Sequence, residues 1–282
     1  MNFKELEQYF LSETASVYEE DEVISLFYMI TENVEGWSRS LVLINKNVEI
    51  SVKKLETYKK IIYELLQGKP IQYILGEAYF YGLLFKVTPA VLIPRPETEE
   101  LVEWILDTLK GSTTKISSIL DIGTGSGCIA ISLKKNLNDT NVTALDISSE
   151  ALLIAEENAK LNNVAIGLLN ENILDYDGNE TYDLIVSNPP YVKIDEQPDM
   201  HTNVLAHEPH LALFVSNEKP LIFYETIADF ASKHLSEEGK LFFEINEYLG
   251  KETADMLKLK GYKTIVIKKD MQGKDRMIYC VK

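Results

Sequence analysis

One stretch of the chain, SSILDIGTGSGCIAI at residues 117–131, limits the possible folds more than any other. An apolar run leads into three alternating glycines, Gly123, Gly125 and Gly127, and a second apolar run follows them. Glycine is needed where a buried strand turns sharply into a helix and where a ligand must approach the backbone closely. The stretch therefore predicts a strand, a ligand-binding turn and a helix, which together open an α/β domain.

The segments that follow continue this alternation of strand-like and helix-like patterns. The strand-like runs read NVTALD, VAIGLL, YDLIVS, KLFFEI, GYKTIVIK and MIYCV. Helical patterns lie between several of them, in SSEALLIAEENAKLNN and in a segment that begins near Gly250. Such alternation is typical of a doubly wound, Rossmann-like α/β fold with a mostly parallel sheet, which is the fold class we predict.

Residues 1–75 carry a different pattern, with apolar residues at helical spacing and no arrangement that is typical of catalysis. Ser16 followed by Glu19 predicts a capping box that opens the second helix of this region. We therefore expect a small helical N-terminal domain, at residues 1–75, that docks the substrate. Residues 76–95 are rich in aromatic and β-branched side chains and predict a β-hairpin linker, which leaves residues 96–282 for the α/β domain.

Asp146 ends the second predicted strand, about 20 residues past the glycine turn, where a carboxylate can accept hydrogen bonds from both hydroxyls of a ribose. A dinucleotide fingerprint requires glycine or alanine where this chain has Cys128, and no Gly-Lys-Ser/Thr follows, which excludes a P-loop. We predict an adenosine derivative without a pyrophosphate, held by residues 123–127 and Asp146. The alternatives are that Asp146 caps the next helix and that the glycines form a plain turn.

The segment YDLIVSNPPY ends the fourth predicted strand with Asn188, Pro189, Pro190 and Tyr191. In a doubly wound sheet the first and fourth strands are neighbours, so Asn188 should face the same pocket as the glycine turn. The side-chain oxygen of Asn188 and the carbonyl of Pro189 can accept the two hydrogens of a planar amide nitrogen, and Tyr191 can lie against the planar group. This arrangement suits methyl transfer from a sulfonium, although a simple proline-rich turn is the alternative.

The charge of the chain bears on its partners. Acidic residues outnumber basic ones by 44 to 28, for a net charge of −16, which disfavours nucleic acid as a partner.

The two cysteines form no disulfide framework, and there is neither a signal core nor an apolar run long enough to span a bilayer. We expect a cytoplasmic protein with neither a nucleic-acid nor a membrane partner. We also expect no metal, because His201, His207 and His210 with Glu208 fit no standard zinc motif.

The chain resembles the PrmC/HemK family of release-factor glutamine N5-methyltransferases over most of its length. The segments that carry the resemblance are QYILGEAYFYGLLFKVTPAVLIPRPETEELVE, LDIGTGSGCIAI, DLIVSNPPYV, HEPHLALF and KKDMQGKDRMIYC. The resemblance implies a class I methyltransferase sheet with a small helical N-terminal domain, and S-adenosyl-L-methionine as the cofactor. It also implies that peptide-chain release factors are the partners, methylated on the glutamine of their Gly-Gly-Gln motif.

Site residues follow from the resemblance position by position. It implies a cofactor site at Gly123, Thr124, Gly125, Ser126, Gly127, Asp146, Asn172, Ile173 and Asn188. It implies a substrate site at Asn188, Pro189, Pro190 and Tyr191, with Asn188, Pro189 and Tyr191 as the catalytic residues. The chain departs from the family pattern at Asn172, where an acid is usual, and at Asn246 and Leu249, where the stretch Glu-x-Gly-x-x-Gln reads EINEYL; these departures leave the role of Glu244 open.

Three other functions stay open from the sequence. A glutamine methyltransferase of a ribosomal protein differs only in its substrate. A DNA adenine-N6 methyltransferase uses a similar acceptor–Pro–Pro–aromatic segment on a flipped base, but the acidic charge disfavours it. A catalytically silent adaptor that binds release factors would need neither the glycine turn nor Asp146.

Overall fold

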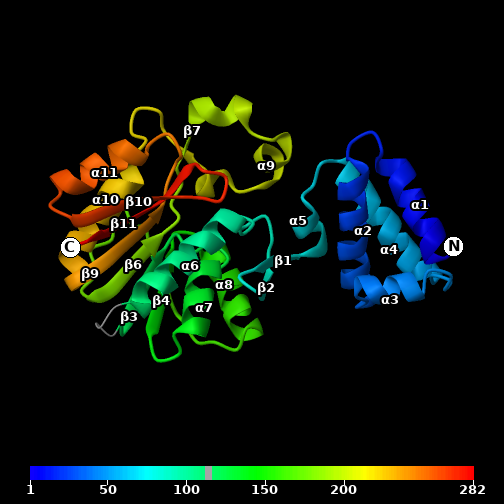
Figure 1. Ribbon diagram of the computed structural model, residues 1–282, viewed down its shortest axis with the longest axis horizontal. Coiled ribbons are helices and arrows are strands. Elements are labelled where there is room, and N and C mark those ends of the chain that lie inside the picture. The colour runs from blue at the N-terminus through cyan, green and yellow to red at the C-terminus, as the bar shows by residue number, and fades with distance from the viewer. Residues whose placement is uncertain (112–115) are drawn as a thin grey trace. The chain divides into compact units, whose positions relative to one another are not determined.

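The computed structural model describes residues 1–111 and 116–282 of the chain (Figure 1). The described residues divide into two compact units. The first unit comprises residues 1–76 together with 201–207, and the second comprises residues 77–200 together with 208–282. No helix of the described residues is both long and apolar enough to cross a membrane.

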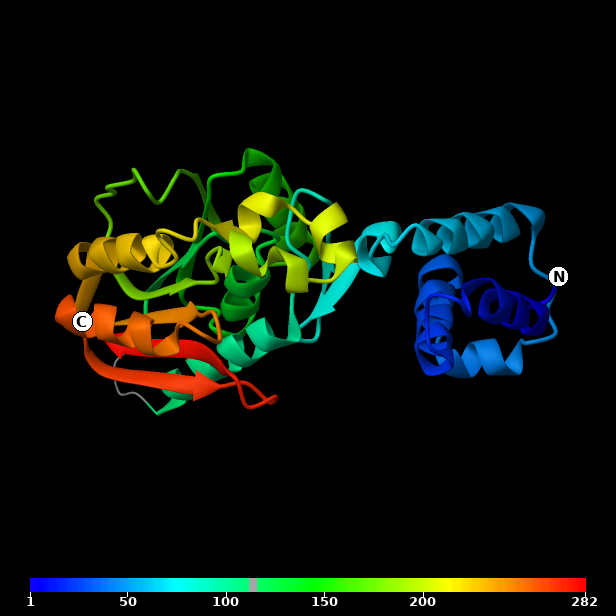
Figure 2. The ribbon, with the colours of Figure 1, turned by 90° about the horizontal axis from the view of Figure 1, so that it is seen from above.

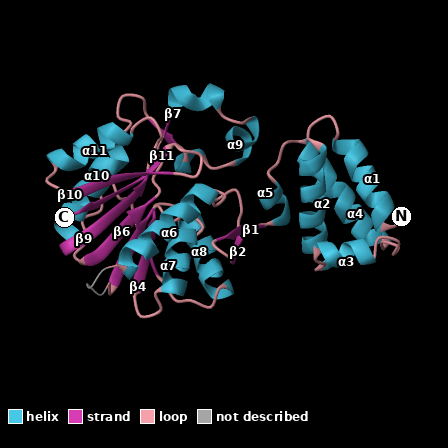
Figure 3. Ribbon diagram, viewed as in Figure 1, coloured by secondary structure: helices cyan, strands magenta, loops and turns pink. Residues whose placement is uncertain are grey.

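The first unit is drawn as helices joined by loops (Figure 3). Its helices are α1 (Phe3–Thr14), α2 (Glu20–Glu35), α3 (Arg39–Ile44), α4 (Val52–Leu66), α5 (Ile71–Leu75) and α9 (Thr202–His207). The apolar faces of α1 to α5 share one core, in which Leu6, Phe10, Phe27 and Tyr58 are almost fully buried. Because burial of apolar surface is favourable, packing of these faces against one another is what stabilises the core of the unit.

The predicted capping box of Ser16 and Glu19 is wrong. Helix α2 begins at Glu20, so Glu19 is itself the N-cap and makes no side-chain capping bond. Ser16 lies in the preceding turn, while three acids in the first turn of α2 favour its start through the helix dipole. A capping box does occur at α1, where Asn2 and Glu5 bond to each other's backbone N–H groups.

The second unit contains the predicted sheet, in the order β10-β11-β9-β6-β3-β4-β5. Its strands are β3 (Ser118–Ile122), β4 (Asn141–Asp146), β5 (Gly167–Asn170), β6 (Tyr182–Ser187), β9 (Leu235–Glu244), β10 (Lys263–Lys269) and β11 (Asp275–Val281). The five strands from β9 to β5 are parallel, whereas β11 runs antiparallel to both of its neighbours. The structure confirms the predicted doubly wound, mostly parallel fold.

Helices cover both faces of this sheet (Figure 1). Helices α6 (Pro96–Lys110), α7 (Cys128–Asn136) and α8 (Ser149–Leu161) contribute to one buried cluster, and α10 (Ile222–His234) and α11 (Gly250–Leu259) contribute to another. Figure 2 shows α11, in orange, lying against β10 and β11. The central strands are therefore buried on both sides, which explains why they read as continuous apolar runs.

The hairpin of β1 (Glu77–Phe80) and β2 (Leu83–Lys86) is shorter than the segment expected to form it. Residues 87–95 leave the hairpin without forming a strand and run toward α6. Asn158 of α8 accepts a hydrogen bond from the N–H of Lys86 (2.6 Å) and donates to its carbonyl (3.0 Å), so β2 is anchored to the sheet domain. The remaining short elements are β7 (Val192–Lys193), β8 (Phe214–Val215) and the 3₁₀ helices at Ile194–Asp199 and His210–Ala212.

Candidate active site

Strands β4 and β5 follow β3 on one side of the sheet, whereas β6 lies on the other side of β3, so the strand order reverses between β3 and β6. A cavity opens beside the carboxyl ends of these two strands. Its volume is about 390 Å³, and every described residue that lines it belongs to the second unit. Ligands of open α/β sheets bind at such a switch point. Ten predicted site residues line it: Gly123, Thr124, Gly125, Ser126, Asp146, Asn172, Ile173, Asn188, Pro189 and Pro190. The loop at residues 89–95 and part of the segment at 209–212 form further walls.

Gly127 does not line the cavity but packs beneath it. Its φ angle is 79°, in the left-handed region, and a Cβ there would lie 2.9 Å from Cδ1 of Ile131 and 3.1 Å from Cβ of Ala155. Gly125 also has a positive φ of 53°, but a Cβ there would meet nothing within 4 Å. The two glycines therefore serve different needs: Gly127 allows close packing against α8, and Gly125 allows the turn alone.

Asp146 holds the glycine turn against the end of β4. Its Oδ2 accepts a hydrogen bond from the N–H of Gly125 (2.8 Å) and its Oδ1 accepts one from the N–H of Ser148 (2.9 Å). Burial raises the pKa of this carboxyl, and these backbone bonds lower it. The cap of α8 is Ser148, whose Oγ accepts from the N–H of Ala151 (3.1 Å). Each carboxylate oxygen of Asp146 keeps a second lone pair for a ligand hydroxyl.

A second carboxylate, Asp121, lies directly behind the glycine turn. Its Oδ2 accepts hydrogen bonds from the hydroxyl of Thr124 (2.6 Å) and the N–H of Ala130 (3.2 Å). Its Oδ1 is buried without a hydrogen-bond partner among the described residues, as is the hydroxyl of Ser126, which lines the cavity. Burial raises the pKa of Asp121 to about 7. Unpaired buried acceptors of this kind require a partner, and a ligand donor would supply one.

The charges around the cavity are mainly negative. Three acids line it, Asp146, Glu150 and Glu171, and Arg95 is the one base of the described lining. The guanidinium of Arg95 forms an ion pair with Glu208, whose side chain is almost fully buried and also accepts from the N–H of Ile93. The lining therefore favours a ligand that carries positive charge over a pyrophosphate.

Asn188 is bonded to residues that are far from it in sequence. Its Nδ2 donates to Oγ1 of Thr98 (3.3 Å), and the Thr98 hydroxyl donates to Oε2 of Glu244 (2.6 Å). Tyr191 does not line the cavity; its hydroxyl donates to Oε1 of Glu244 (3.0 Å). The segment at 188–191 is therefore tied to the start of α6 and the end of β9.

The positions that depart from the family pattern take local roles. Asn172 bonds within its own turn, accepting from the N–H of Leu174 (3.1 Å) and donating to Asp175 (2.7 Å), which still leaves its oxygen one lone pair. Asn246 donates to the carbonyl of Tyr191 (3.1 Å) and so helps to hold that segment. Leu249 precedes α11 and offers its carbonyl to the N–H of Thr253.

Four residues of this site were not identified from the sequence. They are Thr98, Glu208, Asn158 and Asp121, of which only Glu208 was considered, and then only as a possible zinc ligand. The sequence did not indicate a role for Asn158, because it lies within an ordinary helical pattern. In the structure its Nδ2 donates to the carbonyl of Ser126 in the glycine turn (2.9 Å). Among the described residues, no group of three or more His, Cys, Asp or Glu side chains is placed to hold a metal ion.

Comparison with known proteins identifies close relatives of the whole chain. Residues 101–213 match the Methyltransferase small domain family and residues 10–76 match the PrmC N-terminal domain family. A release factor glutamine methyltransferase of Flavobacterium psychrophilum is 48% identical over 99% of this chain and 98% of its own length. One from Bacteroides thetaiotaomicron is 43% identical over 93% of this chain and 94% of its own length. A solved methyltransferase from Pyrococcus furiosus shares the fold, with a TM-score of 0.54 and 21% identity over 78% of this chain and 96% of its own.

Proposed function

Because this chain belongs to the family of release factor glutamine methyltransferases, we propose that it transfers a methyl group from S-adenosyl-L-methionine to a glutamine side chain of peptide-chain release factors. The acceptor atom is the amide nitrogen N5 of the glutamine in the Gly-Gly-Gln motif. One observation carries the proposal: Asn188 and Pro189 line the same cavity as the glycine turn and Asp146. We further propose that residues 1–75 dock the release factor.

The residues around the cavity fit this cofactor. Asp146 can accept from the ribose hydroxyls, and Asn172 and Ile173 offer an acceptor and an apolar wall to the adenine. The unpaired hydroxyl of Ser126 lines the cavity and suits an ammonium group, Asp121 adds negative charge behind the glycine turn, and the acidic lining suits a cation. When bound, the cofactor supplies a methyl group on a positively charged sulfur.

The protein's part in the reaction is to position the glutamine and stabilise developing charge. The Asn188 oxygen and the Pro189 carbonyl accept the two hydrogens of the substrate amide. Prolines at 189 and 190 restrict the backbone, so these acceptors are set before the substrate arrives. As positive charge grows on the nitrogen, both hydrogen bonds strengthen, which stabilises the transition state more than the bound substrate. Tyr191 completes the segment by anchoring it to Glu244.

Mass spectrometry of a release factor incubated with the protein and S-adenosylmethionine tests this function. The expected product is one added methyl group on the glutamine of the Gly-Gly-Gln motif. Parallel incubations with DNA and with ribosomal proteins cover the other methyl-transfer reactions. Methyl groups found only on those molecules would contradict the proposal, and absence of cofactor binding in calorimetry would favour a silent adaptor.

Cofactor affinity is expected to fall as the pH is lowered through about 7, the pKa to which burial raises Asp121. Above that pH the carboxylate is ionised and attracts a cationic ligand; below it the group is neutral and the attraction is lost. Calorimetric titrations should show the Kd for S-adenosylmethionine rising by up to about tenfold per pH unit on the acid side. Asp121→Asn is the control, since its affinity should change much less with pH; parallel profiles for the two proteins would refute this role of Asp121.

A further inference from the structure

Behind Asn188 lies a line of polar contacts that passes through Thr98, which lines the cavity, and ends at Glu244, which does not. It runs from Nδ2 of Asn188 to the hydroxyl of Thr98 and from that hydroxyl to the carboxylate of Glu244. We propose that Thr98 and Glu244 are positioning residues that orient the Asn188 side-chain amide, so that its oxygen faces the substrate. This inference rests on the proposed function, in which that oxygen accepts a hydrogen from the glutamine amide.

The direction of each bond follows from the chemistry of Glu244. An ionised carboxylate only accepts hydrogen bonds, so the Thr98 hydroxyl must donate its single proton to Glu244. The oxygen of Thr98 is then an acceptor toward Asn188, and the amide must present its NH₂ group there. Because the oxygen and nitrogen of a planar amide point in different directions, Oδ1 is left free for another partner. Glu244 thus selects one of the two amide orientations of Asn188.

Burial makes this selection strong. Thr98 is 2% exposed and Glu244 is 1% exposed, so water does not compete for their hydrogen bonds. The second oxygen of Glu244 accepts from Tyr191, and its backbone carbonyl accepts from the hydroxyl of Tyr224 (3.2 Å). The backbone at Glu244 is therefore fixed by Tyr224, and the carboxylate cannot rotate away from Thr98 without also losing its bond from Tyr191.

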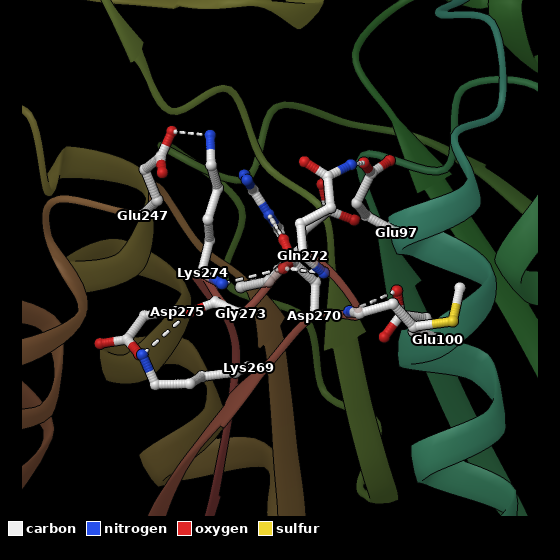
Figure 4. A network of polar contacts seen from close by, with 12 residues as sticks. Glu97, Glu100, Glu247, Lys269, Asp270, Gln272, Gly273, Lys274 and Asp275 are labelled. Atoms are coloured by element: carbon white, nitrogen blue, oxygen red, sulfur yellow. Dashed lines mark hydrogen bonds and ion pairs between the residues drawn. The ribbon is translucent and has the colours of Figure 1, made fainter.

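The turn between β10 and β11 lies beside the first turn of α6 (Figure 4), and Asp270 of this turn holds Arg276, whose charge acts on the carboxylate of Glu244. Asp270 is buried and accepts from Nε of Arg276 (3.1 Å), which fixes the arginine in the region of Glu244. Gln272 donates to Glu97 (3.4 Å), which binds the turn to the first turn of α6, the helix that carries Thr98. Burial raises the pKa of Glu244, whereas hydrogen bonds from Thr98 and Tyr191 and the charge of Arg276 oppose that rise. The turn thereby helps to keep the group an acceptor.

Glu244→Gln tests the inference, because a glutamine has the same shape but can donate to Thr98. The Thr98 proton would then turn toward Asn188 and favour the flipped amide, with NH₂ facing the substrate's own NH₂. We expect kcat for release-factor methylation to fall about tenfold to thirtyfold, with the Kd for S-adenosylmethionine changed about twofold or less. Glu247→Gln, which removes a charge beside Lys274 on the neighbouring surface, is the matched control and should keep wild-type kcat.

Two variants at Thr98 separate orientation from packing. Thr98→Ser keeps the hydroxyl and should keep most of the turnover, whereas Thr98→Val keeps the shape but breaks the line and should lose about as much kcat as Glu244→Gln. In the double variant of Glu244→Gln with Thr98→Val the losses should not add, because both act through Asn188. If Glu244→Gln fails to fold, the Thr98 pair alone decides.

The outcomes distinguish this inference from the proposed function. Wild-type protein that methylates the release factor, with Glu244→Gln and Thr98→Val both equally active, would overturn the orienting role and leave the function intact. Wild-type protein that leaves the release factor unmodified would overturn the function, and the inference with it.

Discussion

Replacing Asn188 with alanine is expected to lower kcat about 100- to 1000-fold, as does loss of one preorganised group that stabilises transition-state charge. The variant loses the side-chain acceptor for one amide hydrogen, while the Pro189 carbonyl and the cofactor site remain. The charge that develops on the substrate nitrogen is then stabilised from one side only. Single-turnover transfer of a labelled methyl group gives the rate, and calorimetry should show cofactor affinity changed by about twofold or less.

Asp146→Ala is the matched control for this prediction, since Asp146 lines the same cavity from the end of β4, the second strand from β6 in the sheet. Its effect should be the converse: cofactor affinity weakened by about tenfold or more, from loss of charge-assisted hydrogen bonds, with a much smaller change in kcat at saturating cofactor. An Asn188→Ala protein that turns over at the wild-type rate would remove the proposed mechanism. If Asn188→Ala lowered cofactor affinity alone, Asn188 would act in binding the cofactor and not in positioning the substrate.

Replacing Gly127 with alanine is expected to destabilise the second unit by about 3 kcal/mol, the sum of left-handed backbone strain and overpacking. The φ of 79° penalises any Cβ, and the added atom would lie 2.9 Å from Ile131 and 3.1 Å from Ala155. Denaturant unfolding followed by the fluorescence of Trp104, in a background with Trp37 replaced by phenylalanine, reports on this unit alone. Trp104 packs against Phe242 within the sheet domain, whereas Trp37 belongs to the first unit.

Gly125→Ala provides the comparison, because Gly125 also has a positive φ but open space around its Cα. It should cost about 1 kcal/mol from backbone strain alone. If the two variants were equally stable, close packing beneath the turn would not be the reason for Gly127. The difference between them measures contact with α8 separately from the conformation of the turn.

Much of the fold follows from local patterns. The run before the glycines, the turn and the helix after it are determined by residues close together in the chain, and the remaining strands are recognisable as buried apolar runs. The same local reasoning misplaced the capping box, because the start of α2 shifted by a few residues and made Glu19 the cap. It also extended the hairpin into residues 87–95, which pair in no sheet and of which residues 89–95 line the cavity.

The sequence by itself determined the α/β class, the glycine turn, Asp146 and the Asn-Pro-Pro-Tyr segment, since each depends on residues that are neighbours in the chain. Only the tertiary structure decided what lies behind them. Thr98 is 90 residues from Asn188 and 146 residues from Glu244. The strand order places β6 beside β9, so that all three residues meet at the carboxyl ends of these two strands. The direction of Tyr191, toward Glu244 and away from the cavity, was decided in the same way. Periodicity contains no information about such contacts, because they arise from packing between elements that are distant in sequence.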